Sequence, residues 1–392
     1  MSFLSVYPNL DVSVVRQGVS RLPTVAILST HPPTQCGLAT FSSALADGFG
    51  AIGVDVKVVR IADGSTTSDT RVVGELVNGV PASVAATAEL LNQSDLAVIQ
   101  HEYGIYGGRD GDEVVDIVGG LRVPSILILH TVLKDPSPHQ RSVLESLAAA
   151  TDHIVVMSEA AQTRLCVGYH VDRRKVTIIA HGATAVAKCM DKRPSRPTLL
   201  TWGLLGPGKG IERVIDAMVS LRTLPGRPRY VVAGRTHPKV LAAEGEAYRD
   251  GLAERARANG VADAVSFDPG YRSLSSLSSL VQSAAVVVLP YDSTDQVTSG
   301  VLVDAIAHGR PVVATAFPHA VEVLSCGAGI VVDHDDPAAL VDALHRVLTQ
   351  PRLSGSMASE ARLLAPTMAW PVVAKTYLTL AQRLLAQRRA LV

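Results

Sequence analysis

The chain has 392 residues, of which 47% are hydrophobic and 18% charged, and this length predicts two domains. Lys and Arg together number 36, as do Asp and Glu, so the net charge is zero and nucleic-acid binding through a basic face is not expected. The four cysteines are far apart and form no Cys-x-x-Cys pair, which favours reduced thiols and a cytoplasmic location.

The first residues lack the basic and apolar regions of a secretory signal, and no apolar run approaches the ~20 residues that span a bilayer. Two small basic clusters, at residues 173–175 and 388–389, leave peripheral membrane contact open. Solvated surface charge is the simpler interpretation of both.

Short apolar runs alternate with helical segments from about residue 24 onward. The expected strands of the first half are residues 25–28, 54–59, 96–100, 125–129, 153–157 and 176–179. Helices are expected between most of them, including residues 40–49 and 139–149. Continuous apolar strands that alternate with helices predict a parallel sheet covered on both faces.

A polar stretch with two prolines, residues 189–197, is expected to be a linker. A second series follows, with strands at residues 199–202, 229–233, 265–267, 285–289, 312–314 and 330–332. Its helices are expected at residues 210–221, 241–258, 274–283 and 337–349. The predicted fold class is therefore α/β, with two tandem doubly wound, Rossmann-like domains that face a cleft. The predicted units are residues 1–190, 191–369 and 370–392, the last carrying an amphipathic helix at residues 370–385.

The segment of residues 291–315 has the most informative pattern. Ser299 and Gly300 open a helix that is apolar almost all round, and Asp304 lies one turn later on the same helix face. A carboxylate in a buried helix is costly without a partner. The N-terminal end of a helix is positively polarised and binds anions. This arrangement suits the diphosphate and hydroxyl groups of a nucleotide sugar.

A glycine-rich segment, residues 203–210, follows the first strand of the second series and contains Lys209. Its glycines allow the backbone to approach a bulky ligand, and the lysine offers a charge for phosphate. The order of a Walker A motif is absent. A glycine-rich turn with a solvated lysine is an equally good interpretation.

The loop of residues 29–41 places Gly37 just before a helix expected to begin near Ala39, so free amides should point into the cleft. It lacks the Gly-x-Gly-x-x-Gly fingerprint, which argues against a nicotinamide site. A simple loop, with His31 at the surface, is the alternative.

In such sheets ligands bind beyond the carboxyl ends of the strands. His130 follows one expected strand, and the segment of residues 100–108 with His101, Glu102 and Tyr103 follows another. Polar and aromatic groups on a glycine-rich loop suit carbohydrate binding, and Glu102 is a candidate base if it reaches an acceptor hydroxyl. The alternatives are a core histidine and an ordinary mobile loop.

Residues 333–337 contain an Asp-x-Asp pattern that superficially resembles a metal motif. Asp336 directly precedes Pro337, however, which is typical of a helix N-cap followed by proline at the first helical position. We assign no metal to this segment.

Most strongly between residues 199 and 332, the chain resembles the retaining, nucleotide-sugar-dependent glycosyltransferases of sequence family four, which have the GT-B fold. The first donor motif of that family is Gly-Arg-Leu-x-x-x-Lys-Gly, and here Leu204 replaces the arginine while Lys209 is kept. The second is Glu-x7-Glu before Ala-x-x-x-Gly-x-Pro-Val, and here Gln296 and Asp304 replace the two glutamates.

The resemblance implies donor-binding roles for residues of the second domain and its partner loop. The diphosphate would contact Gly37, Lys209, Ser299 and Gly300; the base would lie beside Tyr271; the ribose would contact Asp304; and Arg235 is a candidate substitute for the missing arginine. His130 and Gln296 would contact the transferred sugar at the reaction centre. The final helix would cross back to the N-terminal domain.

The implied reaction is transfer of a hexose from a UDP- or GDP-sugar to a hydroxyl acceptor, with retention of configuration and without a cofactor or metal. The acceptor, a saccharide, a lipid-linked molecule or a small molecule, would bind near His101, Glu102 and Tyr103. Two alternatives stay open: a sugar-nucleotide epimerase of the same fold, and a non-catalytic sugar-nucleotide-binding protein, which Gln296 and Leu204 favour.

Overall fold

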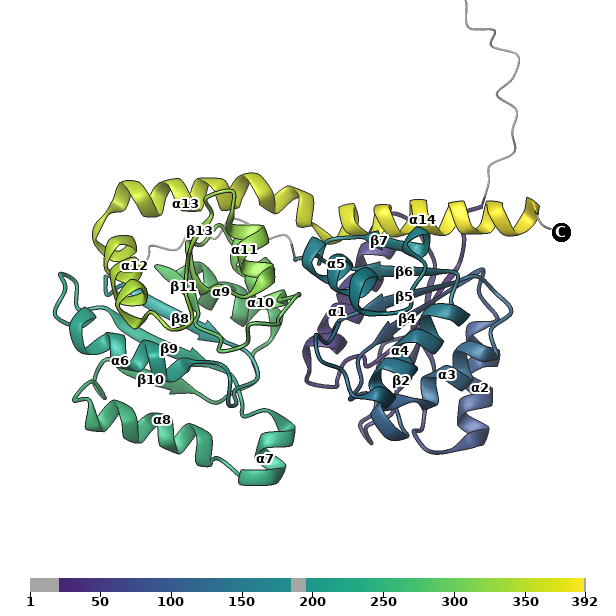
Figure 1. Cartoon of the computed structure of the whole chain (residues 1–392), viewed down its shortest axis with the longest axis horizontal. Coiled ribbons are helices and arrows are strands. Elements are labelled where there is room, and N and C mark those ends of the chain that lie inside the picture. Colours follow the sequence, from purple (N-terminus) through teal and green to yellow (C-terminus); the bar gives the residue numbers. More distant parts are fainter. Residues whose placement is uncertain (1–20, 185–194, 391–392) are drawn as a thin grey trace, which may run out of the picture.

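The computed structural model describes residues 21–184 and 195–390, which form two parallel α/β domains, and a long C-terminal helix lies along the upper edge of the N-terminal domain (Figure 1). The predicted linker falls largely outside the described residues. Each domain has one sheet with helices on both faces, so the predicted fold class is confirmed.

The sheet of the N-terminal domain has the strand order β3-β2-β1-β4-β5-β6-β7, and all its pairs are parallel. Its strands are β1 Val25–Ser29, β2 Val56–Ile61, β3 Val72–Leu76, β4 Leu96–His101, β5 Ser125–Leu129, β6 His153–Val156 and β7 Val176–Ile178. Its helices are α1 Gly37–Ala51, α2 Pro81–Leu91, α3 Glu113–Gly119, α4 Pro138–Ala150 and α5 Glu159–Gly168.

The sheet of the C-terminal domain has the order β10-β9-β8-β11-β12-β13, also parallel throughout. Its strands are β8 Thr198–Trp202, β9 Arg229–Ala233, β10 Val265–Asp268, β11 Val286–Leu289, β12 Val312–Thr315 and β13 Gly329–Val332. Its helices are α6 Ile211–Leu221, α7 Pro238–Glu244, α8 Ala247–Ala258, α9 Leu274–Ser283, α10 Gly300–Ala307, α11 Pro318–Leu324, α12 Pro337–Thr349 and α13 Pro351–Leu364.

Two elements differ from the sequence prediction for local reasons. The single helix expected at residues 241–258 is two helices, because Gly245 ends α7 with a φ of 63° that the next helix cannot continue. The edge strand β3 was not predicted, because its residues are only alternately covered and Gly74 interrupts the apolar pattern.

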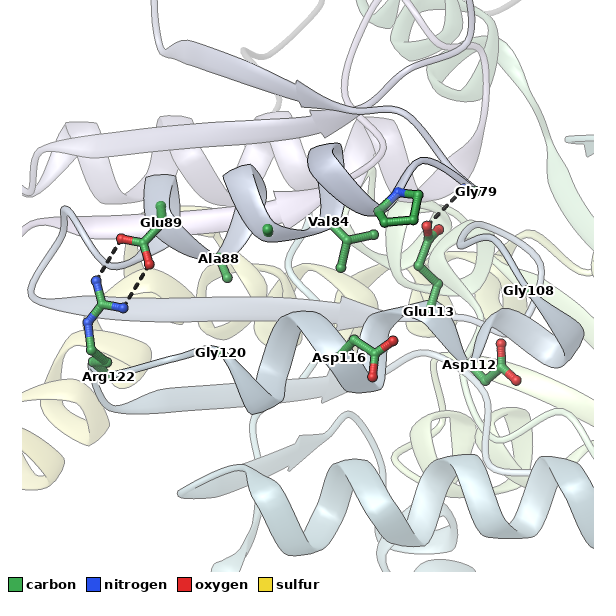
Figure 2. A pocket seen from close by; sticks show the side chains of 12 residues that line it. Gly79, Val84, Ala88, Glu89, Gly108, Asp112, Glu113, Asp116, Gly120 and Arg122 are labelled. Atoms are coloured by element: carbon green, nitrogen blue, oxygen red, sulfur yellow. Dashed lines mark hydrogen bonds and ion pairs between the residues drawn. The ribbon is translucent and has the colours of Figure 1, made fainter.

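A groove of about 700 Å³ lies between α2 and α3, at the outer edge of the N-terminal domain and away from the second sheet (Figures 1 and 2). Its charged groups are largely paired within the chain. Arg122 holds Glu89 through two hydrogen bonds of 2.7 and 2.8 Å, and Glu113 accepts from the amides of Gly79 and Gly107. The groove is therefore a feature of helix packing and does not resemble the predicted site.

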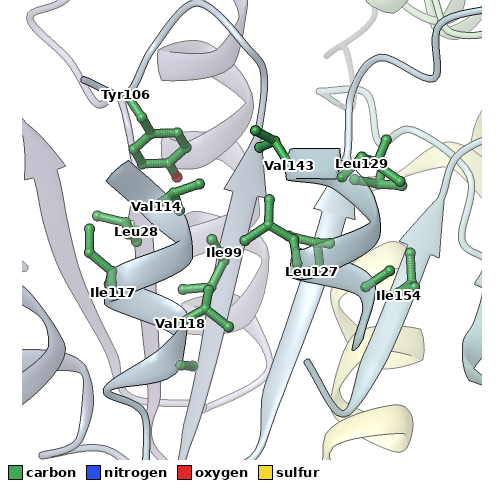
Figure 3. Packing of buried hydrophobic residues seen from close by; sticks show 14 of the residues in the cluster. Leu28, Ile99, Tyr106, Val114, Ile117, Val118, Leu127, Leu129, Val143 and Ile154 are labelled. Carbon is green, nitrogen blue, oxygen red and sulfur yellow. The ribbon is translucent and has the colours of Figure 1, made fainter. Parts of the chain in front are cut away.

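Alternate residues of the central strands are buried on opposite sides of the first sheet, which explains why these strands are continuous apolar runs. Leu28 of β1, Ile99 of β4 and Leu127 of β5 face α3 and α4 (Figure 3). Ile27 and Val98 face α1 and the last helix instead.

That last helix, α14 Trp370–Ala390, begins at the end of the C-terminal domain and packs along α1 of the N-terminal domain (Figure 1). At its start the chain pairs with the segment that leaves the N-terminal domain. The amide of Ala183 donates to Met368 O at 2.7 Å, and the amide of Trp370 donates to Ala183 O at 3.3 Å. The end of the N-terminal domain and the start of α14 are thus paired at Ala183 and Ala369.

We expect Gly48→Ala to loosen the contact between α1 and α14. A Cβ atom at position 48 would lie 2.7 Å from the carbonyl oxygen of Trp370, which is backbone and cannot rotate away. The free energy of unfolding, measured with urea, should fall by about 1–3 kcal/mol. Gly50→Ala in the same helix is the matched control, because a Cβ there meets nothing within 4 Å. Equal losses in both variants would contradict the packing argument.

Candidate active site

The strand order of each sheet reverses once, between β1 and β4 and between β8 and β11. Loops that leave the carboxyl ends of such strands diverge and open a crevice where ligands bind. In the second sheet, the glycine-rich loop after β8 lies against the loop after β11. The Asp292 amide donates to Gly208 O at 2.9 Å, and Gly210, with φ 62°, lies so close to the Pro290 carbonyl that a Cβ would overlap it.

Lys209 lies at this reversal point. Its Nζ is 4.6 Å from the centre of the Tyr291 ring, and the buried Tyr291 ring packs against Phe317. Burial lowers the pKa of the Lys209 ammonium, and no acid of the described residues is paired with it. A partly buried cation held over an aromatic face and left without a counter-ion is suited to bind an anionic ligand.

The N-terminal end of α10 lies at the end of the loop after β11. Ser299 caps the helix by accepting from the Leu302 amide, while its own amide donates to His319 Nδ1 at 2.9 Å. The Ser299 amide is therefore not available to a diphosphate, contrary to the predicted role. Among the described residues, the amides of Gly300 and Val301 have no acceptor, so they remain as the donors at this positively polarised end.

Asp304 lies one turn further along α10 and is partly buried. Burial raises the pKa of its carboxyl to about 7, and no side chain of the described residues donates to it. An unpartnered carboxylate near a helix N-terminus is an acceptor for hydroxyl groups. Ligand binding would supply the hydrogen bonds that this group lacks.

Gln296 lies in the same loop, three residues before the Ser299 cap. Its Nε2 donates to Thr298 O at 3.0 Å, which leaves the amide oxygen as the group available to a ligand. Arg235, which follows β9, reaches across the domain boundary and donates to Gln35 Oε1 at 2.6 Å. Arg235 therefore joins the two domains in this arrangement.

His130 follows β5 in the opposite domain, as predicted. Its Nε2 lies 2.9 Å from Gln100 Oε1, which is an acceptor only, so Nε2 carries the proton and Nδ1 is left as an acceptor. Burial, with the nearby His181 and His101, lowers the pKa of His130 to about 3. The ring is neutral at physiological pH.

An aromatic cluster connects His130 to the N-terminal end of α10. The ring of Phe41, from α1, is 4.7 Å from His130, 5.0 Å from His181 and 4.9 Å from Trp370, measured between centroids. The ring of His181 in turn lies against Gly300, since a Cβ atom added to this glycine would be 3.0 Å from His181 Nε2. The two halves of the predicted site thus meet through one continuous set of contacts.

The acceptor residues predicted in the segment of residues 100–108 are only partly suited to that role. β4 extends through His101, so this residue lies in the sheet, with its ring fully buried and neither nitrogen bonded. Full burial of His101 is at odds with contact to an acceptor. Tyr103 donates to Gln140 O at 3.3 Å. Burial raises the pKa of Glu102, as a general base needs, but Thr131 and the Tyr103 amide already donate to its two oxygens.

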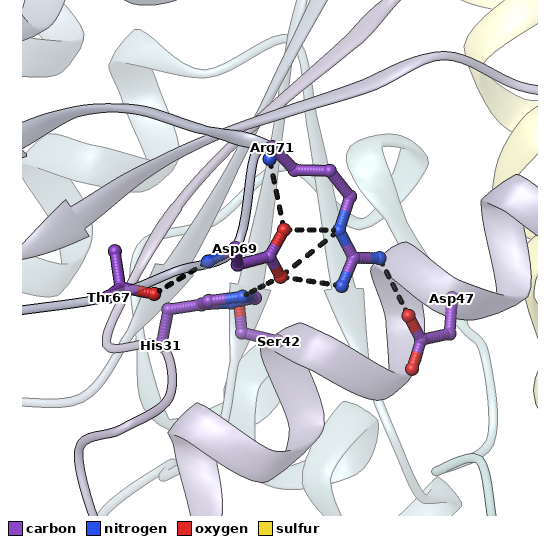
Figure 4. Close-up of polar contacts among 6 residues, drawn as sticks. All are labelled: His31, Ser42, Asp47, Thr67, Asp69 and Arg71. Atoms are coloured by element: carbon purple, nitrogen blue, oxygen red, sulfur yellow. Dashed lines mark hydrogen bonds and ion pairs between the residues drawn. The ribbon is translucent and has the colours of Figure 1, made fainter.

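The loop after β1 is anchored at its base. His31 is fully buried, against the surface position left open by the sequence, and its Nε2 is 2.9 Å from Asp69 (Figure 4). Arg71 donates to both oxygens of Asp69 and also pairs with Asp47 at 2.7 Å. Gly37 is the first residue of α1 rather than a residue before it, and a Cβ there would meet nothing within 4 Å. Space for a ligand is therefore present at Gly37.

Tyr271 lies in the loop after β10 and is 48% exposed, so its ring is accessible to a ligand. Its hydroxyl is 3.4 Å from Thr40 Oγ1 of the N-terminal domain. The neighbouring Arg272 pairs with Asp268 and donates to Ser276 at 2.7 Å. Arg272 is thus part of the scaffold of this loop.

Asp336 caps α12 by accepting from the Ala339 amide at 2.8 Å, which confirms its predicted structural role. Among residues 21–184 and 195–390, no cluster of histidine, cysteine and acidic side chains is arranged to hold a metal ion. In the same residues, no helix has the length and apolar composition needed to cross a bilayer.

Sequence reasoning missed two histidines at the site, His181 after β7 and His319 after β12. Both follow strands, so the rule that selected His130 would also have selected them. Burial lowers the pKa of each to about 4, so both are neutral at physiological pH.

Comparison with solved structures agrees with the fold described above. The chain superimposes on sucrose-phosphate synthase from Thermosynechococcus elongatus with a TM-score of 0.74 and 17% identity, over 93% of this chain and 100% of that one. It superimposes on Anabaena HepE in complex with UDP and glucose with a TM-score of 0.73 and 17% identity, over 92% and 100%. The chain has the GT-B fold.

Sequence comparison finds similarity to glycosyltransferases. Residues 196–350 match the family model described as glycosyl transferases group 1. A D-inositol 3-phosphate glycosyltransferase of Nocardioides sp. (strain ATCC BAA-499 / JS614) is 27% identical over 300 residues, which cover 68% of this chain and 64% of the relative. The match to the family model contains Lys209, Gln296, Ser299 and Asp304.

Proposed function

We propose that the protein is a glycosyltransferase that moves a hexose from a nucleotide-sugar donor, a UDP- or GDP-sugar, to a hydroxyl acceptor with retention of configuration. One observation carries the proposal. Lys209 without a counter-ion, the free amides at the start of α10, and the unpartnered carboxylate of Asp304 all lie at the strand-order reversal of the second sheet. These groups match a diphosphate and a ribose in charge and in hydrogen-bonding capacity.

In the proposed reaction the bond between the anomeric carbon and the phosphate oxygen breaks, and negative charge develops on the departing diphosphate. Lys209 and the amides of Gly300 and Val301 would stabilise that charge, and Arg235 would add to them if it leaves Gln35. These protein groups supply positive charge, so the proposed reaction needs no metal. Stabilising a leaving group with preorganised donors is the largest single contribution to many such reactions.

The N-terminal domain would complete the site. His130 Nδ1 accepts from a hydroxyl of the transferred sugar, and the amide oxygen of Gln296 accepts from a second one. The acceptor hydroxyl attacks the anomeric carbon and releases its proton toward the departing phosphate oxygen. Each oxygen of Glu102 already accepts one hydrogen bond. Glu102 would orient the acceptor by accepting a further hydrogen bond, since a carboxylate oxygen can accept more than one.

The test of this proposal has two steps. A thermal-shift screen should first show stabilisation by either UDP or GDP, because a ligand that binds only the folded protein raises its apparent stability. The corresponding nucleotide sugars are then incubated with a panel of saccharide, polyprenyl-phosphate and polyol acceptors, and glycosylated products are sought by mass spectrometry. The configuration of the product at the anomeric carbon, read by NMR, tests retention.

The side-chain amide of Gln296 already donates to Thr298 O within its own loop. This observation favours the second candidate, a non-catalytic sugar-nucleotide-binding protein. Nucleotide binding without transfer or donor hydrolysis over the whole panel would support that candidate instead. Conversion of the donor alone into an epimer would identify an epimerase.

A further inference from the structure

The loop that carries Gln296 belongs to the C-terminal domain, yet α5 of the N-terminal domain determines its shape. We propose that Ser158, the N-cap of α5, and Arg164 within α5 are positioning residues that place Gln296 for sugar transfer only when the two domains are together. This inference rests on the proposed function. It assigns a role to three contacts that lie outside the predicted site.

The first contact is made by Val297, the residue directly after Gln296. Its side chain is 4% exposed and packs within the hydrophobic core of the N-terminal domain, together with Ala161 and Leu165 of α5. A loop of one domain therefore inserts an apolar side chain into the core of the other. Insertion fixes the position of the backbone beside Gln296, because core packing tolerates little displacement.

The second contact is a hydrogen bond at the start of α5. Ser158 is fully buried, accepts from the Ala161 amide as the N-cap, and donates to Val297 O at 2.6 Å. Its hydroxyl therefore satisfies α5 and the loop at once. Val297, on the C-terminal side of Gln296, is therefore held through both its side chain and its backbone carbonyl.

The third contact holds the other side of Gln296. Arg164 Nη1 donates to Asp295 O at 2.6 Å and to Val132 O at 3.0 Å, so one guanidinium joins the loop to the segment after β5. That segment also contains His130, two residues before Val132. Arg164 thus links the positions of the two residues that we place at the transferred sugar.

A fourth interaction strengthens the same interface. Glu322 of α11 accepts from the amides of Glu159 and Ala160 at 2.9 and 3.2 Å, which places a carboxylate at the N-terminal end of α5. When the domains separate, Gln296 loses the supports on both sides together. Donor contacts by Lys209 and Asp304 do not depend on these supports, since both residues are held within the C-terminal domain.

The test compares Arg164→Met with the matched control Arg141→Met. Arg141 lies in the same domain and donates to Gly168 O, but it makes no contact with the second domain. In Arg164→Met we expect kcat to fall by at least about tenfold, because a displacement of about 1 Å at a reacting group can cost a hundredfold. The dissociation constant for UDP or GDP, whichever binds, should stay within threefold of the wild-type value. Arg164→Lys should restore part of kcat.

Hydrogen exchange of the peptide that covers residues 291–299 gives a readout independent of activity. It should quicken in Arg164→Met and stay unchanged in Arg141→Met. Unchanged exchange, or faster exchange with kcat within twofold of wild type, would overturn the inference. So would a parallel loss of kcat and nucleotide binding, which indicates a general structural defect. If the wild-type protein transfers no sugar, the proposed function fails first, and the exchange result shows separately whether α5 holds the loop.

Discussion

Replacing Lys209 with alanine is expected to lower kcat/KM for sugar transfer by about 10²–10³-fold, the usual cost of losing one preorganised donor to developing negative charge. The loss should appear mainly in kcat, because the departing diphosphate carries more charge than the bound donor. Steady-state kinetics with the nucleotide sugar identified in the transfer screen measures both constants.

The fold should withstand this substitution. The Lys209 ammonium is partly buried without a counter-ion, so its removal leaves no unpaired group behind. The free energy of unfolding is therefore expected to change by less than about 1 kcal/mol. Lys375→Ala, at an exposed position of α14, is the control for loss of a lysine. Near-normal turnover in the Lys209 variant would remove the residue from the mechanism.

Replacing Asp304 with asparagine is expected to weaken nucleotide binding by about 10–100-fold, because charged hydrogen bonds to two ribose hydroxyls become weaker neutral ones. The wild-type protein should also bind nucleotide more tightly as pH rises through about 7, where its buried carboxyl ionises. Calorimetric titration with the nucleotide between about pH 5.5 and 8.5 tests both effects. Identical pH profiles for wild type and Asp304→Asn would contradict the role in ribose binding.

The stability of the wild-type protein should depend on pH in the opposite direction to its nucleotide binding. In the folded protein the Asp304 pKa is raised to about 7, while an unfolded aspartate titrates near about 3.9. Between these values the folded state holds the extra proton, so the wild-type free energy of unfolding falls as pH rises. Asp304→Asn avoids this cost and should be more stable by about 1–3 kcal/mol at pH 8, with no difference below pH 4. Urea unfolding at both pH values measures the difference.

Much of the fold followed from the sequence, because doubly buried parallel strands are continuous apolar runs bounded by turns. The bounds of β5, β9, α9 and α12 agree with the predicted residues 125–129, 229–233, 274–283 and 337–349. The pattern is weaker where burial is incomplete, and β3 at the sheet edge was missed for that reason. The break between α7 and α8 depends on the backbone conformation of Gly245. The periodic spacing of apolar residues does not reveal such a local change.

The sequence predicted only those site residues that directly follow the carboxyl ends of strands. That rule led to His130, Lys209 and the start of α10, whose roles in catalysis stay predictions. It could not show that the Ser299 amide is already bonded to His319, or that His101 is enclosed in its sheet. Both facts depend on contacts between segments far apart in the sequence, which a local pattern does not encode. The same holds for α5 and the Gln296 loop.

The pairing of Ala183 with the chain on both sides of Ala369 limits how the two domains can move. The bridge places Ala183, at the end of the N-terminal domain, beside Ala369, which directly precedes α14. Rotation about a hinge axis through the bridge would leave it intact. The contacts Arg235–Gln35 and Tyr271–Thr40 join residues of opposite domains, so such a rotation would alter them. Opening and closing would therefore change these two contacts while the bridge stays formed.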